Sequence, residues 1–474
     1  MAVDVTGGEL IAKIFSGLLR IDENLKIVPD LAESYRMENG GLRWVFTLRT
    51  DARFSDGSAV TPEDVVFSWK RVLEPKSLSP RKWVFENILG AKSYSNGKTD
   101  VLEGLKIKDS RTIVVELEKY FAPFLHLLTM PAASIVSQKS YENPGVDAAH
   151  TPLGSGPFKL TQWTPDVSVA LEPNIFYPSQ NAVRPSLLYS VIPEDASALS
   201  MLATGELDIL KLPRQQLTSL KTRFPDHTFQ DVQELNTYFI GFDHRKSYLD
   251  LSFRKAVAHL VQKQVWSKTL LGEQAEPAFS PVPSILIPHI LLPHLPEYSE
   301  EKAKALFTQS AAFGKKMVLL ISSSKENFPL AETLQAQLKK IGVSMELKAL
   351  DWAAFKEALV KGEGDLFYLS WWGDYADPEN FLYPPFHSAN HGAGGNRVYY
   401  KNPNMDTLLE TLRIEKGETD RNKILTDILT LFANDLPWVP LWHRKTVFAV
   451  SKRVKNFNAV PLYSMDKGVT LELH

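Results

Sequence analysis

The chain contains no cysteine among its 474 residues. This absence excludes disulfides, thiol catalysis and metal sites built on thiolates. It also fits a protein that folds outside the cytoplasm, where free thiols would form wrong disulfides. Folding must therefore depend on the burial of apolar side chains, for which a chain of this length has ample material.

The chain has no excess of positive or negative charge. Its 53 Lys and Arg residues nearly balance 55 Asp and Glu residues, which gives a formal net charge of −2 at pH 7. Without a basic excess we expect neither nucleic acid nor an anionic membrane as a partner. No apolar run is long enough to span a bilayer, and the first residues lack the pattern of a signal peptide.

Signatures of common enzymes are also absent. The sequence has no GxSxG turn and no HExxH pair. His289 and His294 lie five residues apart with prolines between them, so they share no helix face and we expect no metal site. Asp374 and Asp377 imitate a glycosidase acid pair, but carboxylates across a scissile bond usually come from separate elements. We therefore expect no enzyme, no metal and no cofactor.

The patterns that are present indicate an α/β protein of two or three domains. Apolar residues make up 44% and charged residues 23% of the chain, as in ordinary globular proteins. Alternating strand and helix patterns from Met317 to Ser370 predict a parallel sheet with flanking helices. A β-α-β pattern at 187–212 predicts a second parallel arrangement.

Patterns in the N-terminal part of the sequence predict two helices and a strand. An apolar stripe predicts a helix over 8–18, and the alternation of Trp44, Phe46 and Leu48 predicts a strand. Thr61 stands as an N-cap before Pro62, so a helix should run from there to Leu73. Gly154 and Gly156 punctuate a later strand, and we interpret them as structural and not as a phosphate loop.

The most informative stretch is LSWWGDYADPENFL, residues 369–382. A buried strand leads into two tryptophans, a glycine and two carboxylates. The strand would hold the backbone, the indoles would supply rigid apolar area, and an acid could pair with a cation. The alternative is an ordinary tight turn, in which Asp and Pro have their usual structural roles. These residues alone do not decide between the two.

Four blocks carry a specific resemblance. They are PDLAESY, WVFTLRTDARFSDGSAVTPEDVVFSWKR, GSGPFKL and WWGDYADPENF, and they occur in this order. The chain thereby resembles the oligopeptide- and dipeptide-binding proteins that serve ATP-driven importers, which form family 5 of the extracytoplasmic solute-binding proteins. The resemblance implies a periplasmic-binding-protein type II fold of the three-domain cluster C class, in which two lobes joined by a hinge close on a ligand.

The resemblance also implies approximate domain boundaries. Residues 1–15, 146–240 and 446–474 would form the first lobe, and residues 16–145 an inserted domain. Residues 241–445 would form the other lobe. Ligands of open α/β sheets bind beyond the carboxyl ends of the strands, where the motif at 371–374 must then lie.

The resemblance assigns a role to each motif residue. Asp374 matches the acid of the family's W-x-x-D motif, which holds a peptide's α-amino group by a charge-assisted bond. Trp371 matches the motif's aromatic residue. Ser370, with Trp372 and Gly373 beside it, would offer backbone groups to an extended peptide.

Further ligand contacts follow from looser alignments. The family's first-lobe strand would bring Val5, Thr6 and Gly7 to the ligand. The inserted domain would place an aromatic side chain over it, either Trp83 or Phe85.

The sequence departs from the family at the residue three before the motif tryptophan. Some oligopeptide binders carry an arginine there that reaches the ligand's carboxylate, whereas this chain has Tyr368. Lys325, in the run SSSKEN, and Arg397, in the Gly-rich run HGAGGNR, are alternative cations for that carboxylate. Either is also an ordinary type of solvated surface cation. We therefore expect recognition of the amino end to dominate.

These patterns predict a peptide-binding protein of an importer. Its ligand would be an oligopeptide, a dipeptide or a tripeptide such as glutathione, and its partners would be permease subunits in the membrane. We expect a periplasmic or extracytoplasmic monomer whose export signal is missing from this sequence, with lipid anchoring left open. The alternatives are a receptor of the same fold for nickel chelate, haem or a sugar, or an enzyme or chaperone on a borrowed fold.

Overall fold

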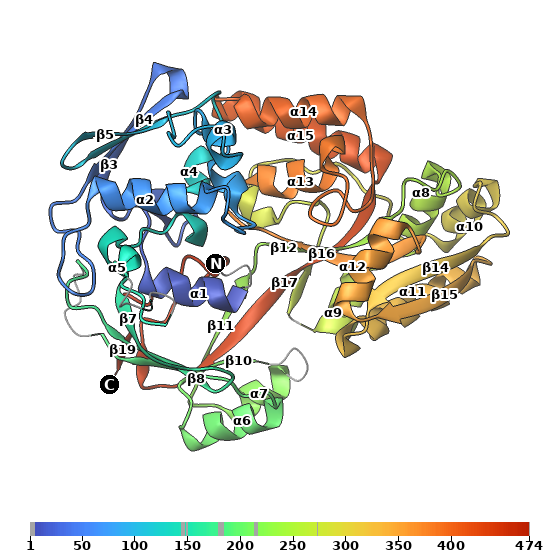
Figure 1. Cartoon of the computed structure of the whole chain (residues 1–474). Helices are drawn as coiled ribbons and strands as arrows, with labels where there is room; N and C mark the ends of the chain where they lie inside the picture. Colours follow the sequence, from blue (N-terminus) through green and yellow to red (C-terminus); the bar gives the residue numbers. More distant parts are fainter. Residues whose placement is uncertain are drawn as a thin grey trace. The chain divides into compact units, whose positions relative to one another are not determined.

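The chain folds into two compact units in a computed structural model that describes residues 5–143, 147, 150–178, 184–212, 217–272 and 274–473. The first unit comprises residues 1–212, 220–232 and 448–474, and the second comprises 213–219 and 233–447. Strand β17 (Trp438–Val450) belongs to the second unit as far as Val447 and then continues in the first (Figure 1). Within the described ranges, no helix has both the length and the apolar character needed to cross a membrane.

Two antiparallel sheets organise the first unit. One has four strands in the order β3-β4-β6-β5, and the other has three in the order β7-β8-β9. The predicted strand around Phe46 is confirmed as β4. The strands of this unit are β1 (Leu19–Ile21), β2 (Ile27–Pro29), β3 (Ala32–Glu38), β4 (Arg43–Leu48), β5 (Leu105–Asp109), β6 (Thr112–Glu116), β7 (Phe158–Thr164), β8 (Ser168–Pro173), β9 (Leu187–Ser190), β10 (Ile209–Lys211), β18 (Val454–Lys455) and β19 (Glu472–Leu473).

The helix predicted after Thr61 is confirmed as α2 (Pro62–Leu73). The Thr61 side chain accepts a hydrogen bond from the Asp64 backbone, and the Asp64 carboxylate accepts one from the Thr61 backbone, which is a capping box. The other helices of this unit are α1 (Val5–Ile14), α3 (Ala91–Ser95), α4 (Phe124–Leu127), α5 (Gln138–Glu142) and α6 (Asp195–Thr204). Helix α7 (Leu217–Arg223) and strand β11 (Thr228–Gln233) each extend across a boundary between the units.

Helix α1 begins and ends earlier than predicted. It ends at Ile14, where the loop that carries Gly154 and Gly156 packs against its last carbonyl groups. A Cβ atom on Gly154 would lie 1.9 Å from the Ile14 carbonyl oxygen, and one on Gly156 would lie 2.4 Å from that of Lys13. Because no side chain fits at either position, the structural interpretation of these glycines is confirmed.

The β-α-β prediction for 187–212 was wrong. Strand β9 pairs with β8, whereas β10 pairs with the Phe448–Val450 end of β17, and both pairings are antiparallel. The helix between them, α6, is present as predicted and ends at Gly205. Local periodicity identified the elements correctly but could not identify their partners, which lie elsewhere in the sequence.

One mixed sheet forms the centre of the second unit, with strand order β17-β12-β16-β14-β15. The predicted parallel part is confirmed, because β14 is parallel to both β15 and β16. Strand β12 is antiparallel to both of its neighbours. The strands are β12 (Asn236–Phe242), β13 (Ala275–Pro277), β14 (Lys316–Ser322), β15 (Ser344–Leu350), β16 (Leu366–Trp372) and β17.

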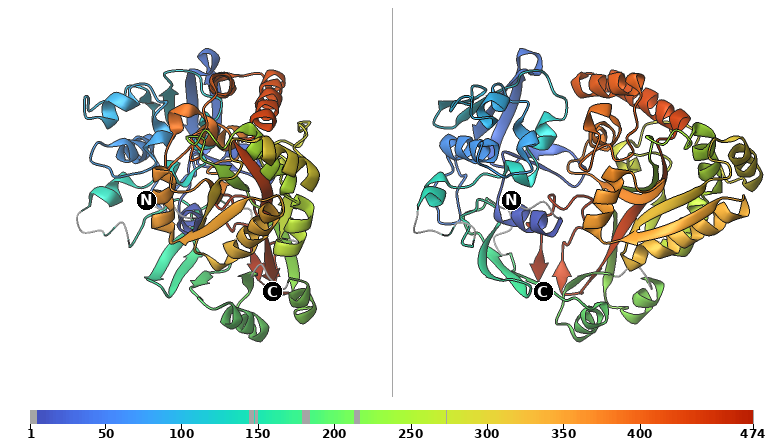
Figure 2. Two further views of the ribbon diagram at one scale, coloured as in Figure 1. Left: turned by 90° about the vertical axis from the view of Figure 1, so that its right-hand side faces the viewer. Right: turned by 45° about the vertical axis from the view of Figure 1, so that its right-hand side comes forward.

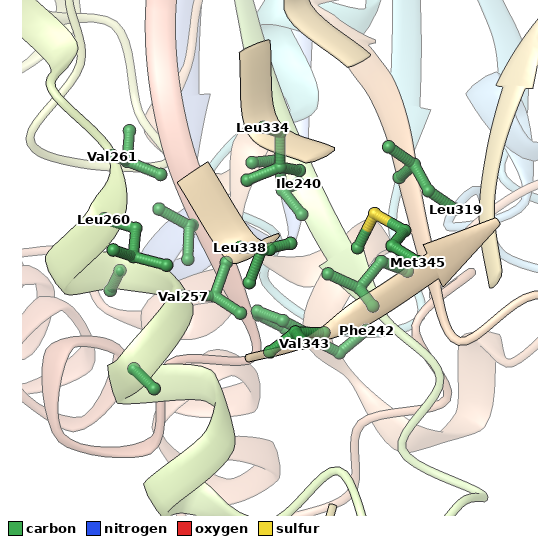
Figure 3. Packing of buried hydrophobic residues seen from close by; sticks show 14 of the residues in the cluster. Ile240, Phe242, Val257, Leu260, Val261, Leu319, Leu334, Leu338, Val343 and Met345 are labelled. Atoms are coloured by element: carbon green, nitrogen blue, oxygen red, sulfur yellow. The ribbon is translucent and has the colours of Figure 1, made fainter. Parts of the chain in front are cut away.

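Helices cover this sheet and bury its apolar side chains. Helix α11 lies along β15 and β14 (Figure 1 and Figure 2). In the close view of Figure 3, Val257 and Leu260 of α8 and Leu338 of α11 face residues of β12 such as Ile240 and Phe242. Complete burial of each such side chain contributes about 1.5–3 kcal/mol. The helices are α8 (Leu251–Leu260), α9 (Lys263–Leu271), α10 (Glu300–Gln309), α11 (Phe328–Lys340), α12 (Trp352–Lys361), α13 (Tyr383–Phe386), α14 (Pro403–Ile414) and α15 (Glu418–Asp435).

Candidate functional site

Strand β16 delivers the motif to the end of the sheet of the second unit. On its β12 side it stays paired to its last residue, where Trp372 lies opposite Asn236 and Ser370 lies opposite Tyr238. On its other side, the ladder with β14 ends at the pair Leu320–Phe367. In the ladders of the described residues, no strand therefore pairs with the β14-side edge of β16 from Ser370 to Trp372. Such an edge presents backbone donors and acceptors to an incoming strand.

The two faces of β16 alternate along the motif. Tyr368 points into the main core, where its ring lies 5.9 Å from Tyr238 and 6.2 Å from Trp442 between centroids. It is buried, so the residue that replaces the family's arginine is a packing residue here. Ser370 and Trp372 follow on the same face of the strand, and Trp372 is 38% exposed.

Trp371 lies on the opposite face and is fixed by the loop that follows it. Its indole Nε1 donates a hydrogen bond of 2.8 Å to the Asn380 carbonyl oxygen. The guanidinium carbon of Arg397 lies 5.7 Å from the Trp371 ring centroid, and Arg397 Nε donates to the Ala393 carbonyl oxygen at 2.7 Å. Burial lowers the pKa of Arg397, which still leaves it charged at neutral pH. The structure thus brings the predicted residues Trp371 and Arg397 together.

Asp374 is half-buried at the start of the loop after β16. Its backbone N–H donates to the Asn380 side-chain oxygen at 2.8 Å, so Asn380 holds both Asp374 and Trp371. Gly373 precedes it and donates its N–H to the Leu235 carbonyl oxygen at 2.8 Å. A Cβ atom on Gly373 would lie 2.9 Å from the Phe381 ring, so a larger residue here would have to displace that buried ring.

Two buried ion pairs hold the rest of the loop. Asp377 is 2% exposed and lies 2.6 Å from Nη2 of Arg421 on α15. Glu379 is 1% exposed, lies 3.0 Å from Nε of Arg413 on α14, and accepts a hydrogen bond from the Tyr375 hydroxyl. Burial raises the pKa of Glu379 to about 6.

These ion pairs give Asp377 the role of a loop support. It caps the short 3₁₀ helix Pro378–Phe381 and accepts the Glu379 backbone N–H at 2.8 Å. The sequence analysis did not identify Glu379, Arg413 or Arg421. No local signal could have done so, because the arginines follow the loop by more than thirty residues and only the packing of α14 and α15 brings them back.

Another cationic side chain, that of Arg444, lies on the same face of the sheet as Trp372. Arg444 of β17 is 2% exposed, and its guanidinium carbon lies 3.9 Å above the Tyr238 ring centroid. Its Nη1 lies 3.5 Å from a carboxylate oxygen of Glu326. Glu326 belongs to the 3₁₀ turn Lys325–Asn327 after β14, and the Lys325 side chain is exposed. The sequence analysis identified Lys325 but not Arg444, which no motif marks.

The residues of the first unit that we expected to contact the ligand lie in surroundings that differ from the prediction. Helix α1 begins at Val5, and Thr6 and Gly7 follow in its first turn. The strand predicted at this position was therefore wrong. Trp83 is half-buried, with the Arg81 guanidinium 6.0 Å from its ring centroid. Phe85 is fully buried and stacks on Trp69 at 5.0 Å, which places it in the core. Among the residues that the structure describes, no three His, Asp or Glu side chains form a group that could hold a metal ion.

Comparison with known proteins gives consistent similarities. Residues 26–393 match the model of "Bacterial extracellular solute-binding proteins, family 5 Middle". The chain is 27% identical to the probable D,D-dipeptide-binding periplasmic protein DdpA of Escherichia coli (strain K12), over 91% of this chain and 82% of that protein. It is 26% identical to Heme-binding protein A of Haemophilus influenzae, over 94% and 84%. The solved structure of the Escherichia coli murein tripeptide binding protein MppA has a TM-score of 0.81 at 25% identity and covers 100% of this chain and 95% of its own.

Proposed function

Because the chain belongs to family 5 of the bacterial extracellular solute-binding proteins, we propose that it captures peptides outside the cytoplasm and delivers them to an ATP-driven importer. Its family consists of binding proteins with the two-lobed type II fold, and the structure is similar throughout to a tripeptide-binding member. We propose that the protein is a monomeric receptor without catalytic activity, with permease subunits in the membrane as its partners. The same proposal leaves a lipid anchor open, which has to be tested on the protein isolated from cells.

The observation that carries the proposal is the edge of β16 beside Asp374. Backbone groups from Ser370 to Trp372 can pair with an extended peptide whatever its side chains are, as in β-strand addition. The half-buried carboxylate of Asp374 follows directly and suits a peptide's α-ammonium group. A neutral solute without a backbone would use neither feature.

The domain boundaries expected from the family remain part of this proposal. The inserted domain at 16–145 and the lobe segments at 1–15, 146–240 and 446–474 would correspond to the first unit described above, except that residues 213–219, 233–240 and 446–447 belong to the second unit. The lobe expected at 241–445 would correspond to the second unit. A hinge between them would include β17, since that strand continues from one unit into the other.

Mass spectrometry of ligands released from the purified, unfolded protein tests this function. We expect a pool of short peptides. Release of one small molecule, such as haem, a metal chelate or a sugar, would instead favour a receptor of the same fold for that solute. The similarity to Heme-binding protein A is the observation behind this alternative. If nothing is released, titration with defined peptides by calorimetry becomes the test, and no binding at millimolar concentration would contradict the proposal.

A further inference from the structure

The Arg444 guanidinium lacks the hydrogen bonds that a buried cation needs. Its Nε and Nη2 atoms are buried and have no hydrogen-bond partner among the described residues. Nη1 has the Glu326 carboxylate at 3.5 Å, which is the outer limit for a hydrogen bond. Buried polar groups are nearly always paired, so an acceptor bound at this edge of Arg444 would be stabilised.

Stacking on Tyr238 does not supply that partner. The ring face attracts the positive charge of the guanidinium, whose carbon lies 3.9 Å from the centroid. The five N–H donors of arginine, however, lie in the guanidinium plane and point away from the ring. Stacking therefore holds the group in position but satisfies none of its N–H donors.

The arginines of α14 and α15 that support the neighbouring loop offer a comparison. Arg421 lies 2.6 Å from Asp377, and Arg413 lies 3.0 Å from Glu379. Both carboxylates are almost completely buried. Arg444, which is more buried than either of these arginines, has only Glu326, whose side chain is 44% exposed and lies farther away. Of these three arginines, Arg444 has the longest distance to its carboxylate.

The position of the guanidinium connects it with the motif. The Arg444 backbone belongs to β17, but its side chain crosses the Tyr238 ring on β12 and reaches Glu326, beyond the end of β14. Strand β16 lies between β12 and β14, and Ser370 lies directly opposite Tyr238. Trp372 on the same face lies 6.4 Å from Tyr238 in an edge contact. The guanidinium thus lies beside the end of β16 that has the unpaired edge.

We propose that Arg444 binds the carboxylate of the ligand, and that Glu326 is the internal carboxylate which this ligand group displaces. A ligand carboxylate can accept two parallel hydrogen bonds from Nη1 and Nη2, a geometry that favours arginine over lysine. This inference rests on the proposed function, because it takes the carboxyl end of a peptide as the group that is bound. It revises the expectation that recognition of the amino end dominates, since a buried cation is available for the other end.

Calorimetry with two equimolar tripeptide pools tests the inference. One pool has free carboxyl ends and the other has the same sequences as C-terminal amides. We expect the unmodified protein to bind the free acids at least ten-fold more tightly than the amides, and Arg444→Gln to bind both pools alike. Arg444→Lys should recover only part of the preference. Lys340→Gln, which removes an exposed charge of α11, should keep the full preference.

Glu326→Gln provides a variant that should fold normally, because this side chain is largely exposed. We expect it to bind the free acids several-fold more tightly and the amides as before, since a competing carboxylate is removed. A preference for free acids that persists in Arg444→Gln, or a Glu326→Gln variant that leaves binding of free acids unchanged, would overturn the assignment. Failure of the unmodified protein to bind either pool would instead overturn the proposed peptide function on which the assignment depends.

Discussion

The indole of Trp371 is hydrogen-bonded to the backbone of Asn380, whose side chain in turn accepts the backbone N–H of Asp374. One asparagine therefore sets the position of both motif residues. Beneath it, Asp377 and Glu379 are paired with arginines of α15 and α14. The acid that we expect to bind ligand is thus held on a loop with few ways to move, which reduces the entropy lost on binding.

The first prediction concerns Asp374. Its change to Asn should weaken binding of free tripeptides by about 1.5–3 kcal/mol, the range for a hydrogen bond to a charged group. N-acetylated tripeptides, which lack the ammonium group, should bind this variant no more weakly than they bind the unmodified protein. Calorimetry with both peptides measures this double comparison. Asp420→Asn, an exposed change at α15, is the matched control, and an Asp374→Asn variant with unchanged affinity would remove Asp374 from the site.

The second prediction concerns the support of the loop. Arg421→Met should lower the free energy of unfolding by about 3 kcal/mol, because it leaves the Asp377 carboxylate buried without its cation. Urea unfolding followed by tryptophan fluorescence measures this. The double variant with Asp377→Asn should recover part of the loss. If Arg421→Met were as stable as the unmodified protein, the ion pair would contribute little to holding the loop.

The third prediction concerns pH and Lys263. Its ammonium group is buried, with the Ala278 carbonyl oxygen at 2.9 Å, and burial lowers its pKa from 10.5 to about 7. Between pH 7 and 10 the unfolded chain therefore binds a proton that the folded chain has lost, so this group makes stability rise with pH. Its contribution is about 1.4 kcal/mol per pH unit. Below pH 7 Lys263 is protonated in the folded protein too, which must then bury the charge of its ammonium group.

Comparison with Lys263→Met isolates this effect. We expect the variant to gain less stability than the unmodified protein between pH 7 and 10, and to be relatively more stable at pH 6. Urea unfolding at several pH values gives both curves. Parallel curves over this range would show that Lys263 titrates near its ordinary pKa in the folded protein.

The fourth prediction concerns closure of the lobes. A protein of this fold that grips a peptide should have a smaller radius of gyration when the peptide is bound. Small-angle X-ray scattering with and without saturating tripeptide measures the change. Identical curves at saturation, confirmed by calorimetry on the same sample, would indicate a rigid site and contradict a clamp.

Much of this protein could be predicted from local patterns. The capping box at Thr61, the strand and helix alternation from Met317 to Ser370, and the four family blocks each depend on residues that are near neighbours in the sequence. Such signals are strong because steric fit, hydrogen bonding within a turn and helical periodicity act over a few residues. They also identified the motif strand β16 correctly, whereas the role of Asp374 after it stays a prediction.

Tertiary packing decided the rest. Strand β9 pairs with the preceding strand β8, whereas β10 finds its partner in β17, more than two hundred residues later in the sequence. Phe85 lies in the core because Trp69 stacks on it, which its own neighbours do not indicate. Arg444 follows Trp371 by more than seventy residues and meets the motif face only because β12 lies between their strands. Whether a charged side chain is solvated or buried without a partner depends on what the fold places around it, and no local pattern contains that information.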